Sequence, residues 1–168
     1  LYQPILFGAT VGMNYRFPLA TSTWDELEYN ALQRVISSGR FSMGPEVHDF
    51  EQDFAKFFGS KFAVMVNSGS SANLLMVAAL FFSKNPTLKL GAGDEIIVPA
   101  VSWSTTYYPL YQYGLKMKFV DIDLQTLNYD LSALADAVTD QTRAIMAVNL
   151  LGNPNDFDQI ASIIGDRN

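Results

Sequence analysis

A short polar turn, Asn67–Ser71, offers residue types that could bind an anion. Gly69 permits a positive φ there, and Ser70 and Ser71 fall in the first turn of the helix expected to follow. Unpaired backbone N–H groups, the positive end of the helix dipole and two hydroxyls make such a turn suitable for a phosphate. Serine and asparagine are also ordinary helix caps, so a turn that binds nothing is the alternative.

The turn lacks the sequence patterns of the common nucleotide and esterase sites. No Gly-Lys-Ser/Thr follows the glycine, and neither G-x-G-x-x-G nor G-x-S-x-G is present at this turn. A phosphate bound here therefore need not belong to a nucleoside triphosphate or a dinucleotide.

Two flanking runs must position this turn. Phe62–Val66 is short, apolar and rich in β-formers, which predicts a buried strand, and Ala72–Phe82 is rich in helix formers. Similar runs predict further strands at Glu95–Ala100, Met117–Ile122 and Ala144–Leu150. The alternation of strands and helices predicts a mostly parallel, doubly wound α/β sheet with helices on both faces.

Local signals set the expected helix ends. Thr23-x-x-Glu26 reads as a capping box, and Pro45 suits the first position of the next helix, which Gly59 would close. A helix is expected from about Ser104, bent or broken near Pro109. Asp130 is expected to cap the helix that follows it, and the last expected helix is Phe157–Ile164.

Composition limits the classes of function. The chain has 168 residues, 49% of them hydrophobic, and a net charge of −6, which argues against a nucleic-acid binder. It has no cysteine and a single histidine, His48, expected on the surface, so a transition-metal site is not expected. The longest apolar run is shorter than the about 20 residues that cross a bilayer, and a cytoplasmic location fits.

The ends of the sequence suggest where the folded region lies. Leu1–Gly12 has neither a basic leader nor a cleavage site, and Met13 is a plausible natural start, so we assign residues 1–12 to a leader outside the domain. The folded region is expected over residues 13–168. The chain ends directly after a helix where the alternation calls for another strand, so we expect the front part of a longer protein.

Several segments together resemble the PLP-dependent sugar aminotransferase and dehydratase family (DegT/DnrJ/EryC1/StrS), of the aspartate aminotransferase fold type. The resemblance is carried by NSGSSANLL, GDEIIVPAVSWSTTYYP, FVDIDLQTLNYD, RFSMGPEVHDFEQDFAKFFGSKFAV and VNLLGNPNDFD. It covers essentially residues 14–168. Within the family, PLATSTWDELEY and PAVSWSTTYYP look most like the 3-dehydratases of nucleotide-linked 4-keto-6-deoxyhexoses.

The resemblance implies a cofactor site. It implies that Gly69, Ser70 and Ser71 hold the phosphate of pyridoxal or pyridoxamine 5′-phosphate, and that Trp103 stacks on the pyridine ring. A flat aromatic face suits an electron-poor ring, although without the family Trp103 would be interpreted as a packing residue.

The resemblance also implies that no catalytic residue lies in this chain. It places the acidic partner of the pyridine nitrogen, and the lysine of aminotransferases or histidine of 3-dehydratases, downstream of Asn168. His48 does not match that histidine. No lysine matches the Schiff-base position, and all are expected to be solvated surface charges: Lys56, Lys61, Lys84, Lys89, Lys116 and Lys118.

By this resemblance the leading hypothesis is a fragment of a PLP/PMP-dependent sugar 3-dehydratase of deoxysugar biosynthesis for surface polysaccharide. Its substrates would be glutamate and a nucleotide-linked keto-deoxysugar, and the complete enzyme would be a homodimer. A sugar aminotransferase of the same family is one alternative. A truncated, non-catalytic family member is another.

Overall fold

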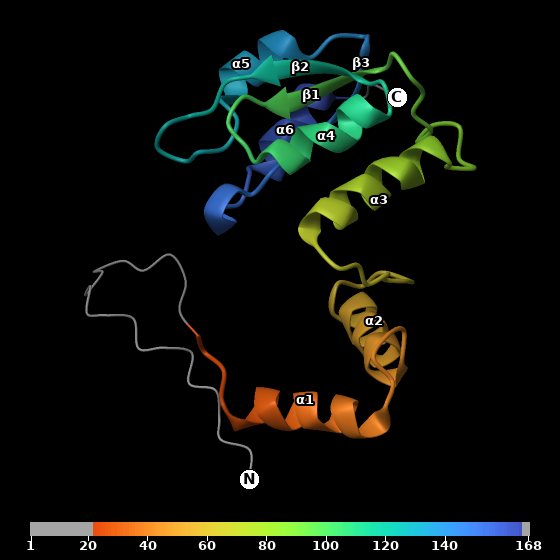
Figure 1. Ribbon diagram of the computed structural model, residues 1–168. Helices are drawn as coiled ribbons and strands as arrows, with labels where there is room; N and C mark the ends of the chain where they lie inside the picture. The colour runs from red at the N-terminus through yellow and green to blue at the C-terminus, as the bar shows by residue number, and fades with distance from the viewer. Residues whose placement is uncertain (1–21, 166–168) are drawn as a thin grey trace. The chain divides into compact units, whose positions relative to one another are not determined.

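Residues 22–165 are described by the computed structural model, which divides into one unit up to Met65 and a second from Val66 onward (Figure 1). Each unit is treated by itself. The sheet and both serines of the predicted site belong to the second unit.

The first unit contains two helices, α1 (Glu26–Ser38) and α2 (Pro45–Phe57). The predicted capping box of α1 is wrong by two residues. Asp25 is the N-cap and accepts from Leu27 N at 2.7 Å, while the Glu28 carboxylate accepts from Asp25 N at 2.8 Å. Aspartate caps more strongly than threonine, so the start of the helix moves to the better cap.

The ends of α2 agree with prediction. Pro45 is its first residue, where a missing N–H costs no helical bond. Gly59 follows the helix with φ 65°, and the Gly59 and Ser60 N–H groups donate to the carbonyls of Lys56 and Ala55. These bonds pair two of the carbonyl groups that a helix end leaves free.

The second unit is a three-stranded parallel sheet in the order β2-β1-β3. Figure 1 shows the arrows of β1 and β2 pointing in the same direction. In chain order its elements are α3 (Gly69–Phe81), β1 (Glu95–Pro99), α4 (Ser104–Gln112), β2 (Lys116–Val120), α5 (Leu131–Ala137), β3 (Thr142–Ile145), the short 3-10 turn Leu150–Gly152, and α6 (Phe157–Ile164).

The central strand β1 supplies both cores of this unit. Ile96 and Val98 face α3 and α4, where they pack with Val77 and Leu110. Ile97 points to the other face and packs in a cluster with residues of α5 and α6, including Leu134 and Ile160. Helices therefore cover both faces, and the predicted doubly wound α/β sheet is confirmed.

The strand predicted at Phe62–Val66 does not form. Its side chains are largely exposed, Phe62 by 77%, and the Met65 N–H donates to the Glu51 carboxylate at 2.8 Å rather than to a strand. β-Propensity creates a strand only where a neighbour completes the ladder, and no such neighbour pairs with this run among the described residues. The expected strand Ala144–Leu150 is likewise shorter and displaced, since β3 is Thr142–Ile145.

Pro109 does not break α4, which runs without interruption through Gln112. The other predicted caps hold. Asp130 accepts from Ser132 N and Ala133 N at the start of α5, and α6 stops at Gly165. None of the helices formed by residues 22–165 combines the length and hydropathy needed to span a bilayer.

Candidate functional site

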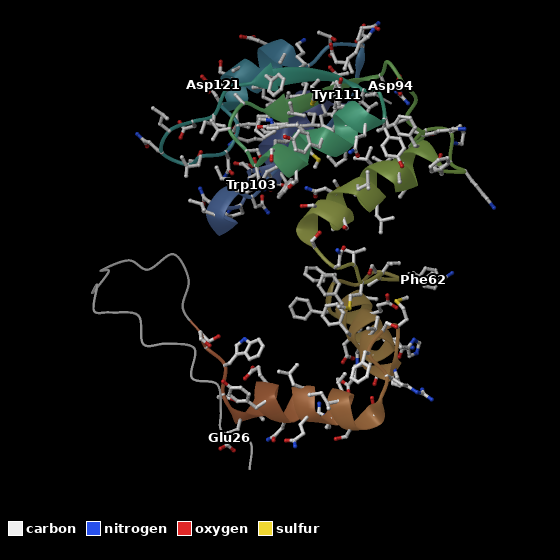
Figure 2. All side chains as sticks on the ribbon, viewed as in Figure 1. Glu26, Phe62, Asp94, Trp103, Tyr111 and Asp121 are labelled. Carbon is white, nitrogen blue, oxygen red and sulfur yellow. The ribbon has the colours of Figure 1, made fainter. Side chains whose placement is uncertain are left out.

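Trp103, a candidate from the sequence, lies at the carboxyl edge of the sheet. Figure 2 shows Trp103 and Asp121 beyond the arrowheads of β1 and β2, whereas Asp94 lies at the opposite edge. Ligands of open parallel sheets bind at the carboxyl edge, outside the strand ends. α3 and α4 run side by side in the same direction, so both present their N-termini at this end (Figure 1).

The first turn of α3 is organised around Ser68, its N-cap. The Ser68 Oγ accepts from Ser71 N at 3.2 Å, and the Ser71 hydroxyl donates to Asn67 Oδ1 at 2.7 Å. The Ser70 hydroxyl makes no hydrogen bond with any residue that the structure describes, and neither do the N–H groups of Gly69 and Ser70. The turn thus keeps two amides and one hydroxyl for a ligand.

Gly69 differs from the prediction in its conformation. It is the first residue of α3 and is absent from the glycines with positive φ, so its φ is not in the left-handed region. A Cβ built at Gly69 would meet no atom within 4 Å and would project into open space. The glycine is therefore not required by the turn itself.

Trp103 is the N-cap residue of α4 and is 74% exposed. Its indole pairs with no other ring in residues 22–165. The loop that carries it is held by Tyr107, whose hydroxyl donates to the Pro99 carbonyl at 2.7 Å. Burial raises the pKa of Tyr107, and a hydrogen bond with Ser102 opposes that rise, so the hydroxyl stays a donor at neutral pH.

One side-chain bond links α3 to α4 beside the predicted site. The Asn73 amide donates to the Thr105 carbonyl oxygen at 3.2 Å. Next to it is a hollow of about 210 Å³, whose lining is Ser70, Ser71, Leu74, Thr105, Tyr108, Pro109 and Gln112. The structure thus brings Ser70 and Ser71 to the first turn of α4. Trp103 does not line this hollow, but Thr105, two residues further on, does.

The histidine and the lysines considered in the sequence analysis lie outside the lining of the hollow beside Ser70. His48 is exposed on α2, 2.9 Å from the Gln52 amide. The lysines are exposed as expected except Lys118, which is half-buried and donates to the Ala137 carbonyl at 2.7 Å. None lines the hollow beside Ser70. No group of three or more potential metal-ligating residues occurs within residues 22–165.

Two residues of this arrangement were missed from the sequence, Ser68 and Asn73. Ser68 could have been found as the last residue before the helix with a capping side chain. Asn73 is a polar side chain in an otherwise apolar run, which indicates a specific partner, but nothing local identifies that partner as Thr105.

Comparison with known proteins finds the same family by family model and by individual relatives. The model of the DegT/DnrJ/EryC1/StrS aminotransferase family matches residues 22–168. The chain is 68% identical over 151 residues to GDP-4-keto-6-deoxy-D-mannose 3-dehydratase of Escherichia coli O55:H7, covering 90% of this chain. It is 66% identical over 147 residues to the enzyme of that name from Yersinia pseudotuberculosis, covering 88% of this chain. The chain spans 38% and 37% of the length of these two relatives.

Solved structures of relatives have the same fold. The E. coli dehydratase with bound hydrated PLP is 67% identical with a TM-score of 0.85, covering 90% of this chain and 38% of that one. A putative sugar aminotransferase from Streptococcus pneumoniae, in its PLP form, is 26% identical with a TM-score of 0.76, covering 89% of this chain and 36% of that one. These are proteins of the aspartate aminotransferase-like fold, and the predicted fold type is confirmed.

Proposed function

This chain belongs to the DegT/DnrJ/EryC1/StrS aminotransferase family, and on that premise we propose that it is part of a PLP/PMP-dependent 3-dehydratase. The substrate class is a nucleotide-linked 4-keto-6-deoxyhexose, with glutamate as amino donor. The observation that carries the proposal is the α3 turn with unpaired donors at Ser70, set beside the α4 turn that follows Trp103, in a chain 68% identical to such a dehydratase.

The donor set of the α3 turn fits a phosphate monoester. The free N–H groups of Gly69 and Ser70 and the Ser70 hydroxyl are donors, and the helix dipole adds positive potential at the same point. Charge-assisted bonds of this kind are roughly twice as strong as neutral ones. A Cβ at position 69 would meet no atom within 4 Å, so the space beside this residue is open.

Trp103 supplies the flat surface that an aromatic cofactor ring requires. Its exposed indole would gain apolar burial and ring stacking when a pyridine ring covers it. Tyr107, bonded to Pro99, and the Ser102–Thr106 hydroxyl pair at 2.8 Å fix the loop from which the indole projects. When bound, pyridoxamine 5′-phosphate supplies an electron sink for the reacting carbon of the substrate.

Proton transfer is assigned to a residue outside the chain. No lysine and no histidine among residues 22–165 lines the hollow beside Ser70. In this proposal a histidine moves the proton in a dehydratase, and a lysine would do so in an aminotransferase. The complete protein is further proposed to be a cytoplasmic homodimer that acts in deoxysugar biosynthesis.

Aminotransfer is the second candidate. It is favoured by the likeness to the putative sugar aminotransferase of S. pneumoniae. The higher identity to 3-dehydratases, including 44% to dTDP-4-dehydro-2,6-dideoxy-D-glucose 3-dehydratase of Saccharopolyspora spinosa, favours dehydration.

The test is a titration of the intact protein encoded by the gene with pyridoxamine 5′-phosphate. Ser70→Ala and Trp103→Ala should each weaken binding about tenfold or more, as expected from losing a charge-assisted bond or an aromatic stack. Tyr111→Ala is the control, because Tyr111 is an equally exposed aromatic on α4 away from the hollow. Unchanged affinity in both site variants would exclude the assignment.

The reaction class is tested separately with a GDP-linked 4-keto-6-deoxyhexose and glutamate. Mass spectrometry should detect a product that has lost its 3-hydroxyl. Accumulation of a 4-amino sugar instead would show aminotransfer.

A further inference from the structure

Pro109 leaves one carbonyl of α4 without its helical partner. In an uninterrupted helix the N–H of residue 109 would donate to the carbonyl of Thr105, but proline has no N–H. The pyrrolidine ring also crowds that carbonyl. The helix nevertheless continues to Gln112, so the Thr105 oxygen needs a partner from elsewhere.

Asn73 of α3 is that partner. Its side-chain amide donates to the Thr105 oxygen at 3.2 Å, and both residues are half-buried between the two helices. The bond lies close to both helix N-termini. Asn73 follows Ser70 by three residues, and Thr105 follows Trp103 by two. A single hydrogen bond therefore connects the turn with free anion donors to the turn that carries the exposed indole.

We infer that Asn73 is a positioning residue: through the Thr105 carbonyl left free by Pro109, it sets the spacing between the Ser70 turn and Trp103. This inference rests on the proposed function, since it concerns one cofactor held at both points. A phosphate and a pyridine ring are joined by a short CH2–O link, so both anchors must lie within a limited separation for simultaneous contact. Asn73 contacts neither group of the cofactor in this scheme.

The primary test replaces Asn73 in the intact protein and measures the Kd for pyridoxamine 5′-phosphate by equilibrium dialysis, without substrate. Asn73→Leu removes the donor at similar size and should raise the Kd about three- to tenfold. Asn73→Asp keeps the shape but places a carboxylate against the Thr105 oxygen, so it should weaken binding at least as much. Asn73→Ala serves if leucine does not fit the half-buried position.

Pro109→Ala separates positioning from simple stability. Alanine restores an N–H that can donate to the Thr105 oxygen within α4, so this carbonyl is no longer left unpaired when Asn73 is replaced. In the Pro109→Ala background, Asn73→Leu should cost little in melting temperature, yet it should still raise the Kd by the same factor. The bond between helices is lost in either background.

The outcomes are distinct. If Pro109→Ala rescues both the melting temperature and the Kd of Asn73→Leu, Asn73 serves only to pair the Thr105 carbonyl and the inference is wrong. If Asn73→Leu leaves the Kd unchanged while Ser70→Ala raises it, the inference is wrong and the proposed function stands. If neither Ser70→Ala nor Trp103→Ala changes the Kd, the proposed function falls and the inference with it.

Discussion

The hydroxyl of Tyr129 donates a 2.9 Å hydrogen bond to the carbonyl of Met146, the residue directly after β3. Tyr129 is 4% exposed and also reaches the Ile97 carbonyl of β1 at 3.4 Å. Burial, with a smaller contribution from Tyr107, raises the pKa of Tyr129 far above its ordinary value, so the hydroxyl remains a donor throughout the physiological range. One buried side chain thereby holds the carboxyl end of the sheet, where the candidate site lies.

Tyr129→Phe should therefore lower the free energy of unfolding by about 1 kcal/mol, because the half-buried Met146 carbonyl loses its donor while the ring packing is kept. Urea denaturation followed by circular dichroism measures the difference. Tyr111→Phe removes a hydroxyl that is exposed and makes no hydrogen bond to the described residues, so it should be neutral. Equal effects of the two substitutions would contradict the assigned role of Tyr129.

Asp123 links stability to pH. Its carboxylate accepts from the N–H groups of Thr126 at 2.8 Å and Gln125 at 2.9 Å, and these bonds lower the pKa of Asp123 below its ordinary value. A group whose pKa is lower in the folded state stabilises the fold above its unfolded pKa, about 3.9, and loses that contribution as pH falls through the folded value. Asp123→Asn should thus destabilise the protein at pH 7 and have a smaller effect near pH 3.

The measurement is the difference in unfolding free energy between Asp123→Asn and the native protein at both pH values. Asp136→Asn is the control, since Asp136 is exposed and accepts no hydrogen bond within residues 22–165. An Asp123→Asn effect that grows as the pH falls would have the wrong sign for this mechanism.

The 168-residue chain expressed by itself should self-associate. α1 has no buried residue and α2 buries only Ala55. Phe50, Phe54 and Phe58 form one exposed stripe, with ring centroids 5.6 Å and 4.6 Å apart along it. Contiguous exposed apolar surface of this kind drives association in water.

Light scattering after size exclusion should give a mass above the 18.6 kDa of a monomer. Phe54→Glu places a charge in the stripe and should shift the distribution toward the monomer. Lys56→Glu changes the charge of the same helix outside the stripe and should not. A monomer in all three cases would show that this surface does not drive association.

The sequence predicted the second unit well because its signals are local and agree with one another. The apolar run at β1, the cap at Asp130 and the stop at Gly165 each specify their own element. Prediction failed where an element depends on a distant partner. Phe62–Val66 has strand composition but no neighbouring strand, and Pro109 was expected to disturb a helix whose free carbonyl is instead paired by Asn73.

The residues of the candidate site also differ in whether local sequence predicts them. Ser70 and Ser71 follow from a turn and a helix start, which are encoded within a few residues. The role proposed for Trp103 came only from family resemblance, because an exposed tryptophan at a helix N-cap has no local signature of a ligand. The bond from Asn73 to Thr105 spans 32 residues of sequence, and only the packing of α3 on α4 brings the two together.

Ser68 and Ser70 lie in the same turn, but their replacement by alanine should affect different properties. Ser68→Ala should lower stability, whereas Ser70→Ala should lower cofactor affinity. Ser68 accepts from the Ser71 N–H as the N-cap of α3, so Ser68→Ala should cost about 1 kcal/mol of stability. The Ser70 hydroxyl makes no hydrogen bond within the described residues, so Ser70→Ala should leave stability within about 0.5 kcal/mol of the native protein. Its cost should appear instead in the affinity for pyridoxamine 5′-phosphate. Thermal melting with and without saturating cofactor measures both effects: Ser68→Ala should melt lower in either condition, and Ser70→Ala only when cofactor is present. A large loss of stability in cofactor-free Ser70→Ala would mean that this hydroxyl serves the fold and is not held for a ligand.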